Sequence, residues 1–146
     1  MSSWVSTMVC YGKILPKKNP GAVTGPEVFD EYDISEYDFM KDASAKLNID
    51  VDDIDELFES MCKNINLPED FALWRNFGDE YNDYHDYVIY INRSELENSR
   101  TAICELKQIT ENPKITQEDI DNFKLFCDTY NIPGTEPDWL AGAWYG

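Results

Sequence analysis

Basic residues are scarce in this chain, which excludes several classes of partner. Of its 146 residues only 12 are lysine or arginine, against 29 aspartates and glutamates, so the formal net charge is −17 at pH 7. Nucleic acid and anionic membrane surfaces would repel a chain of this charge. We therefore expect no direct binding to nucleic acid or to a membrane.

Long apolar runs and closely spaced cysteines are also missing. No stretch approaches the ~20 apolar residues of a membrane-spanning helix, and the first residues lack the basic and apolar regions of a secretory signal. Zinc and redox sites usually contain close pairs such as CxxC, whereas the four cysteines of this chain lie far apart among apolar or aromatic neighbours. We interpret them as buried free thiols and expect a reducing, cytoplasmic environment. They are Cys10, Cys62, Cys104 and Cys127.

Familiar catalytic and metal-binding motifs are absent as well. The sequence contains no nucleophile elbow, HExxH motif, glycine-rich phosphate loop or paired histidines. The acidic run that starts at Asp50 fails the calcium-loop pattern, because Ile54 stands at a ligand position and the turn glycine is missing. We expect no metal site, no cofactor and no assigned catalytic residue, and the pattern argues against an enzyme.

The single histidine supports one enzymatic alternative. His85 lies between Tyr84 and Asp86, just before a predicted strand. It would act as an acid–base group, oriented by Asp83 or Asp86, in a small enzyme or ligand-binding domain that uses residues 84–87. The simpler interpretation of His85 is an exposed residue at the edge of a strand.

The apolar content predicts a folded domain. Hydrophobic residues make up 42% and aromatic residues 14% of the chain, which is too much for a disordered protein. We predict a single compact domain over residues 1–146, with a mobile loop around 16–33 where prolines and glycines concentrate. Alternating and β-branched residues predict strands at 4–15, 87–93 and 101–109, with a hairpin connection at 94–99 between the last two.

Helical spacing of apolar residues predicts three helices. The first is capped by Ser35 with Asp38 three residues later, the second starts near Val51, and the third is capped by Thr116. The predicted fold class is α+β, a small and mainly antiparallel sheet with about three helices packed on one face. The apolar tail at 137–146 is interpreted as a strand or cover on this core. Its alternative role is an exposed aromatic anchor for a homodimer or for a structural subunit of an assembly.

The acidic residues concentrate in two tyrosine-containing stretches, 30–39 and 78–87, and along the second predicted helix. Residues three and four apart on a helix have Cβ atoms about 5–6 Å apart, a spacing comparable to that of phosphates along a nucleic-acid strand. An acidic helix face can therefore imitate a row of phosphates. A solvated face that only increases solubility is the alternative. The predicted partner-binding residues are Asp30, Glu31, Asp33, Glu36, Asp38, Asp52, Asp55, Glu56, Glu59, Asp79, Glu80, Asp83 and Asp86.

In size and net charge the chain is similar to small acidic inhibitors, such as phage-encoded DNA-mimic anti-restriction or anti-CRISPR proteins and the immunity proteins that block toxic nucleases. The resemblance covers charge and length only and transfers no site residues. It implies a viral, anti-defence type of inhibitor or adaptor whose acidic face occupies the basic site of a nucleic-acid-handling protein. Long-range charge would steer that association, and salt would weaken it.

Overall fold

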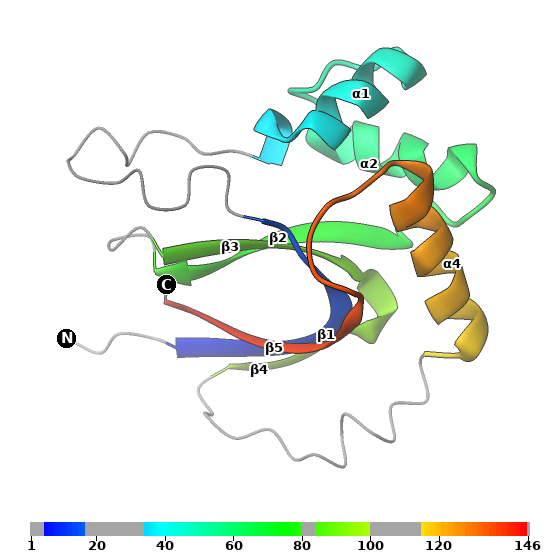
Figure 1. The fold of residues 1–146 in the computed structure, drawn as a ribbon. Helices are drawn as coiled ribbons and strands as arrows, with labels where there is room; N and C mark the ends of the chain where they lie inside the picture. Colours follow the sequence, from blue (N-terminus) through cyan, green and yellow to red (C-terminus); the bar gives the residue numbers. More distant parts are fainter. Residues whose placement is uncertain (1–4, 17–33, 80–83, 100–114, 146) are drawn as a thin grey trace, which may run out of the picture.

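The computed structural model describes residues 5–16, 34–79, 84–99 and 115–145 (Figure 1). Its strands are β1 (Val5–Ile14), β2 (Ala72–Asp79), β3 (Tyr84–Ile91), β4 (Leu96–Ser99) and β5 (Asp138–Tyr145). Its helices are α1 (Asp38–Leu47), α2 (Ile54–Asn64), α4 (Gln117–Thr129) and the short 3-10 helices η2 (Ile34–Glu36) and η3 (Asn92–Ser94). These elements confirm the predicted α+β class, with helices packed on one face of a mainly antiparallel sheet.

The sheet curls until it closes on itself. Its strand order is β3-β2-β5-β1-β4, and β3 also pairs with β1. Strands β1, β5, β2 and β3 therefore form a closed ring, to which β4 adds a fifth strand. Among the described strands the only parallel pairing joins β2 to β5, at Gly78 and Trp144. In Figure 1 β5, β4 and the N-terminal part of β1 lie below the β2–β3 pair, and the C-terminal part of β1 curves up to meet that pair, so the sheet has an inner and an outer face.

One edge of β1 is covered by an interrupted strand. The C-terminal part of β1 pairs with β3, as in Ile14 with Val88, and its N-terminal part pairs with β4, as in Val9 with Leu96. The helix η3 inserts three residues between these two partners. At the interruption the buried Ser94 hydroxyl accepts a hydrogen bond from the Tyr11 N–H (2.8 Å) and donates one to the Ile91 carbonyl (2.6 Å). Ser94 thus replaces the ladder bond that the insertion removes.

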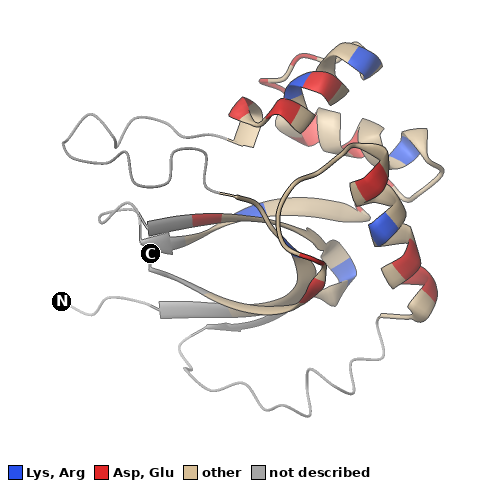
Figure 2. Ribbon diagram, in the orientation of Figure 1, with Lys and Arg blue, Asp and Glu red and all other residues tan. Residues whose placement is uncertain are grey.

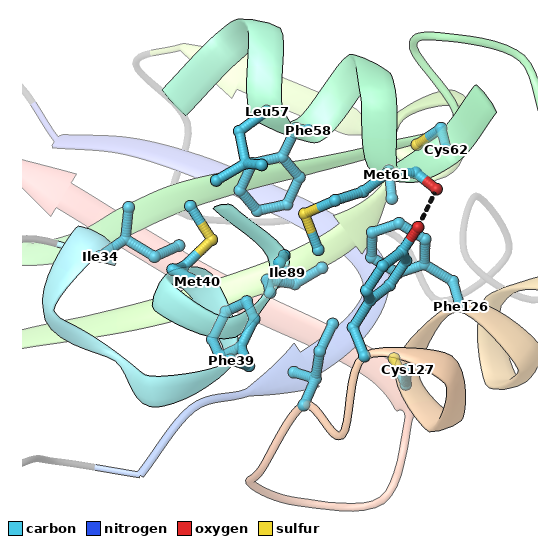
Figure 3. Packing of buried hydrophobic residues seen from close by; sticks show 14 of the residues in the cluster. Ile34, Phe39, Met40, Leu57, Phe58, Met61, Cys62, Ile89, Phe126 and Cys127 are labelled. Carbon is cyan, nitrogen blue, oxygen red and sulfur yellow. Dashed lines mark hydrogen bonds between the residues drawn. The ribbon is translucent and has the colours of Figure 1, made fainter. Parts of the chain in front are cut away.

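The larger of two hydrophobic cores lies between the outer face of the sheet and the helices, and we call it the outer core. The predicted helical pattern of α2 is confirmed, since Leu57, Phe58, Met61 and Cys62 are buried there. Figure 3 shows α2 side chains pointing toward Ile89 of the sheet and Phe126 of α4. The Tyr130 hydroxyl, at the end of α4, donates a 2.5 Å hydrogen bond to the Met61 carbonyl and ties the two helices together (Figure 3).

The smaller core fills the inner face of the sheet, and we call it the inner core. Its buried residues all come from strands; they are Met8, Cys10, Phe77, Val88 and Tyr90. The alternation of β1 accounts for the division, because Met8 and Cys10 point inward while Tyr11 contacts the outer core. Strand β5 passes close to Phe77 only because residue 142 is glycine. A Cβ atom there would lie 2.7 Å from Phe77 Cδ1.

The predicted start of α4 is confirmed. The Thr116 hydroxyl accepts the Asp119 N–H (3.2 Å), and Asp119 Oδ2 accepts the Thr116 N–H (3.0 Å), which forms a reciprocal capping box. The other oxygen of this buried carboxylate accepts a hydrogen bond from the Arg93 guanidinium. Asp119 therefore also connects α4 to the interrupted edge of the sheet.

The predicted cap of the first helix is wrong. Ser35 lies within η2, and α1 begins at Asp38, after an N-cap residue, Tyr37, that makes no side-chain capping hydrogen bond. Burial positions this end of the helix instead. Ile34 and Tyr37 lie in the outer core, and the Tyr37 hydroxyl donates a 2.7 Å hydrogen bond to the Pro16 carbonyl. The predicted mobile loop at 16–33 lies outside the described residues apart from Pro16.

The predicted hairpin connection at 94–99 is also wrong. Residues 96–99 form strand β4 and pair with β1. Strand β3 forms its hairpin with β2, and its residues Val88, Ile89 and Tyr90 also pair with β1, so both edges of this part of β3 are occupied. The predicted strand at 101–109 lies outside the described residues. The tail interpretation as a strand is confirmed, since β5 pairs with β1 along its whole length.

Candidate functional site

Six carboxylates gather in the ten residues that form the turn before α2 and its first two turns. We call this stretch the acidic segment; its acidic residues are Asp50, Asp52, Asp53, Asp55, Glu56 and Glu59. All six are exposed. No lysine or arginine occurs between Lys46 and Lys63, so the segment is anionic throughout.

The amphipathic pattern of α2 holds these carboxylates outward. Its apolar side chains are buried in the outer core, so the residues on the opposite side of the helix face solvent. The preceding turn is shaped by its own hydrogen bonds, in which Asp50 Oδ1 accepts the Asp52 N–H and the Asp50 carbonyl accepts the Asp53 N–H, both at 3.0 Å. Acids at this end of the helix also interact favourably with the helix dipole. The backbone thus presents the carboxylates on a fixed support.

Ion pairing within the described residues leaves the acidic segment uncompensated. Three ion pairs form there, Lys63 with Glu69 (3.2 Å), Arg75 with Glu95 (3.7 Å), and Arg93 with Asp119. None of them uses a carboxylate of the acidic segment. In Figure 2, acidic positions recur along α1, α2 and α4, with fewer basic positions between them. No described basic residue therefore relieves the mutual repulsion in the segment, which solvent and counterions screen.

The structure separates the predicted partner-binding residues into groups. Asp52, Asp55, Glu56 and Glu59 lie together in the acidic segment, and the exposed Glu36 and Asp38 lie at η2 and the start of α1. Asp79 is the last residue of β2, and its side chain is not among those that the structure describes. Five others lie outside the described residues; they are Asp30, Glu31, Asp33, Glu80 and Asp83.

Asp86 belongs to a different part of the molecule. It is exposed on β3 and shares the inner face with Val88 and Tyr90, at the side of a small hollow lined by Cys10, Ile14, Phe77, Asp86, Val88, Leu140, Ala141 and Gly142. Its neighbour His85 pairs in register with Gly78, and the His85 side chain lies outside the described part. Tyr87 points the other way, into the outer core. The predicted site at residues 84–87 is thus divided between the two faces of the sheet.

Buried thiols offer little nucleophilic chemistry. Cys10, Cys62 and Cys127 are free and buried, as predicted, whereas Cys104 lies outside the described residues. Burial raises the pKa of Cys10 and of Cys127 to about 12, and it also raises the pKa of Cys62. These thiols are therefore protonated at neutral pH, and the thiolate is the nucleophilic form.

The described ranges contain neither a membrane-spanning helix nor a cluster of metal-binding side chains. Of the helices described there, none is both long enough and apolar enough to cross a membrane. Over the same ranges, no group of three or more histidine, cysteine, aspartate or glutamate side chains is arranged to hold a metal ion. With six exposed carboxylates in ten residues, the acidic segment is the densest group of charges among the described residues.

Two members of the acidic segment were not among the predicted partner-binding residues. Asp50 and Asp53 fall outside the i, i+3, i+4, i+7 spacing that starts at Asp52, so the helical spacing used to choose the acidic row did not include them. Their signal in the sequence is the run of acids at 50–56, in which only Val51 and Ile54 are apolar. No local pattern in the sequence indicated the hollow, because its lining residues come from four strands that are separated in the sequence.

Comparisons of the chain with models of protein families, with curated proteins and with solved structures find no match. The function therefore has to be argued from the chemistry of this chain alone.

Proposed function

We propose that the protein is an acidic inhibitor or adaptor that binds the basic site of a nucleic-acid-handling protein, with the acidic segment as the contact surface. The observation that carries the proposal is the density of exposed carboxylates. Six lie within ten residues on one turn and helix, and none forms an ion pair with a described residue. A basic groove on a partner would supply the positive charge that the described residues do not.

The geometry of the segment supports imitation of a nucleic-acid backbone. Asp55 and Glu59 are four residues apart on α2, and Glu56 and Glu59 are three apart, so their Cβ atoms are neighbours at about 5–6 Å. Because α2 is anchored in the outer core by four buried side chains, this row keeps its spacing without a partner. Binding would then cost little ordering of the protein backbone. The proposal places the protein in the cytoplasm, where nucleic-acid enzymes act and thiols stay reduced.

The test begins with capture of host proteins on the immobilised protein at low and at physiological salt, followed by elution with duplex DNA or with RNA. We expect one basic nucleic-acid-binding protein that nucleic acid and salt both displace. Its affinity is then measured for the isosteric variant Asp52→Asn/Asp55→Asn/Glu56→Gln/Glu59→Gln. Four exposed charge pairs at about 0.2–1 kcal/mol each predict at least a severalfold loss of affinity.

A second quadruple variant provides the matched control. Glu118→Gln/Asp121→Asn/Asp128→Asn/Glu136→Gln removes the same number of Asp and Glu charges from exposed positions in and after α4. Net charge changes equally in the two variants. A difference between their affinities for the partner would therefore show that the interface is local to the acidic segment. We expect nearly wild-type affinity for the control. Equal losses in both variants would show that net charge alone attracts the partner, and a captured partner that nucleic acid does not displace would contradict the proposal.

A further inference from the structure

The hollow on the inner face of the sheet is a second surface, on the opposite side of the sheet from the helices that carry the acidic segment. Strands β1, β2, β3 and β5 all contribute to its lining. Its volume is about 100 Å³. An apolar cavity of about 150 Å³ accepts benzene, so this hollow has room for about four or five non-hydrogen atoms. Its occupant would therefore be a small group.

The chemistry of the lining is simple. Ile14, Val88 and Leu140 supply aliphatic walls, and Phe77 supplies an aromatic one. Among the described lining residues the one carboxylate is that of Asp86, and burial raises the pKa of the Cys10 thiol to about 12, which keeps that thiol neutral. None of the eight lining residues is basic. Binding sites for small molecules typically combine apolar walls with a few polar groups that orient the ligand.

We propose that this hollow binds a small alkylammonium group, with the alkyl chain against Ile14, Val88 and Leu140 and the ammonium beside Asp86. An anion would meet a carboxylate and the field of a chain with net charge −17. A neutral alkyl group would contact the apolar walls and add no attraction of opposite charge to Asp86. An alkylammonium uses both features, because its apolar part leaves water while its charged end stays hydrated beside the exposed Asp86. The inference does not depend on the proposed function, which concerns α2 on the other face.

The probe is n-butylammonium, which has five non-hydrogen atoms and is also the side chain of lysine. Binding is followed by two-dimensional NMR of the ¹⁵N-labelled full chain, against a reference titration with sodium chloride at matched ionic strength. We expect saturable shifts centred on the amides of Cys10, Val88 and Leu140. The isosteric neutral probe 1-butanol should bind severalfold more weakly. A parallel titration with Nα-acetyl-lysine amide distinguishes a free amine from a lysine side chain as the natural source.

Two variants locate the site. Asp86→Asn should weaken n-butylammonium binding at least threefold at low salt and leave 1-butanol unchanged, whereas Asp52→Asn, the same charge change in the acidic segment, should alter neither. Ile14→Phe should fill the hollow and abolish the shifts. If that variant does not fold, the comparison of Asp86→Asn with Asp52→Asn decides the question alone.

Three results would overturn the inference. The first is an absence of saturable shifts up to about 100 mM, the weak end for a ligand of five atoms. The second is equal binding of 1-butanol and n-butylammonium, and the third is equal loss of binding in the two aspartate variants. Capture of a basic partner through α2 would be unaffected by any of them, so this inference and the proposed function can fail separately.

Discussion

The outer and inner faces of the sheet bury their side chains in different ways. Among the described side chains the outer core contains twenty buried residues, drawn from helices as well as strands, whereas the inner core contains five, all from strands. Helices bring long apolar side chains to the outer face at each turn, whereas the described side chains of the inner face are covered by the curvature of the sheet itself. We therefore expect the outer core to supply most of the stability and the inner core to set the shape of the sheet.

The largest predicted effect comes from opening the outer core. Phe58 is 2% exposed, and its ring stacks on Phe126 with centroids 6.5 Å apart. Phe58→Ala should lower the free energy of unfolding by about 3–5 kcal/mol, because it removes buried apolar surface and leaves a cavity. Urea denaturation measures this change.

An exposed leucine in the same helical layer provides the control for Phe58. Leu125 is 50% exposed on α4, so Leu125→Ala should change the free energy of unfolding by less than about 0.5 kcal/mol. A cost for Phe58→Ala below about 1 kcal/mol would contradict the role given to the outer core, since that is an ordinary value for any point mutation.

A medium effect should follow from filling the inner core. Gly142→Ala places a Cβ atom 2.7 Å from Phe77 Cδ1, and overpacking of this kind costs about 1–3 kcal/mol. Shortening the opposing side chain should recover part of the loss, so Phe77→Leu/Gly142→Ala should be more stable than the sum of the single changes predicts. A double-mutant cycle in urea measures the coupling. Strict additivity would show that β5 does not press against Phe77.

The smallest predicted effect is the pH dependence of stability that comes from one buried thiol in each core, Cys10 in the inner core and Cys127 in the outer core. Burial raises the pKa of Cys10 and Cys127 from 9.0 to about 12, so the folded protein binds these protons more tightly than the unfolded chain. The resulting stability is present below pH 9 and is lost as the pH rises toward 12. Between pH 8 and pH 10 each thiol should account for about 1 kcal/mol of the decline.

Alanine variants separate the two thiols. Cys10→Ala and Cys127→Ala should each lose less stability between pH 8 and pH 10 than the unmodified protein, by similar amounts, in urea denaturation at the two pH values. Tyrosines titrate in all three proteins as well. Burial is the main cause of the raised pKa of Tyr90 and of Tyr11, and Cys10 and Cys127 are lesser causes, so the tyrosine contributions should differ little between the variants. Declines of the same size in all three would mean that the thiols are not shielded from water in the folded state.

Local patterns in the sequence were sufficient for α2 and for the start of α4, but not for the start of α1 or for the closure of the sheet. The apolar spacing of α2 and the capping box at Thr116 each depend on residues within a few positions, and both predictions were confirmed. Strand β4 is only four residues long and reads as a polar turn, with Glu97, Asn98 and Ser99. Its assignment depends on β1, which lies far away in the sequence and determines the register.

The candidate site shows the same division. Helical spacing identified four exposed acids of the acidic segment, three of them on α2, because a buried apolar side requires a polar opposite side. Asp86 was grouped with them by charge alone. The two-residue period of β3 instead puts it on the same side as Val88 and Tyr90, in the inner face. Strand alternation was a better guide to that position than the local density of acids.

The long pairing between β1 and β5 has a consequence for how the chain is made. Val5 pairs with Tyr145 and Gly12 with Asp138, so the first and last described strands must meet before the ring can close. Contacts this distant in sequence form slowly, because a long loop must be ordered first. On the ribosome, α1 and α2 emerge well before β5 and cannot yet pack on a finished sheet. Until residue 145 is synthesised, the apolar side of α2 therefore has no completed surface to cover it.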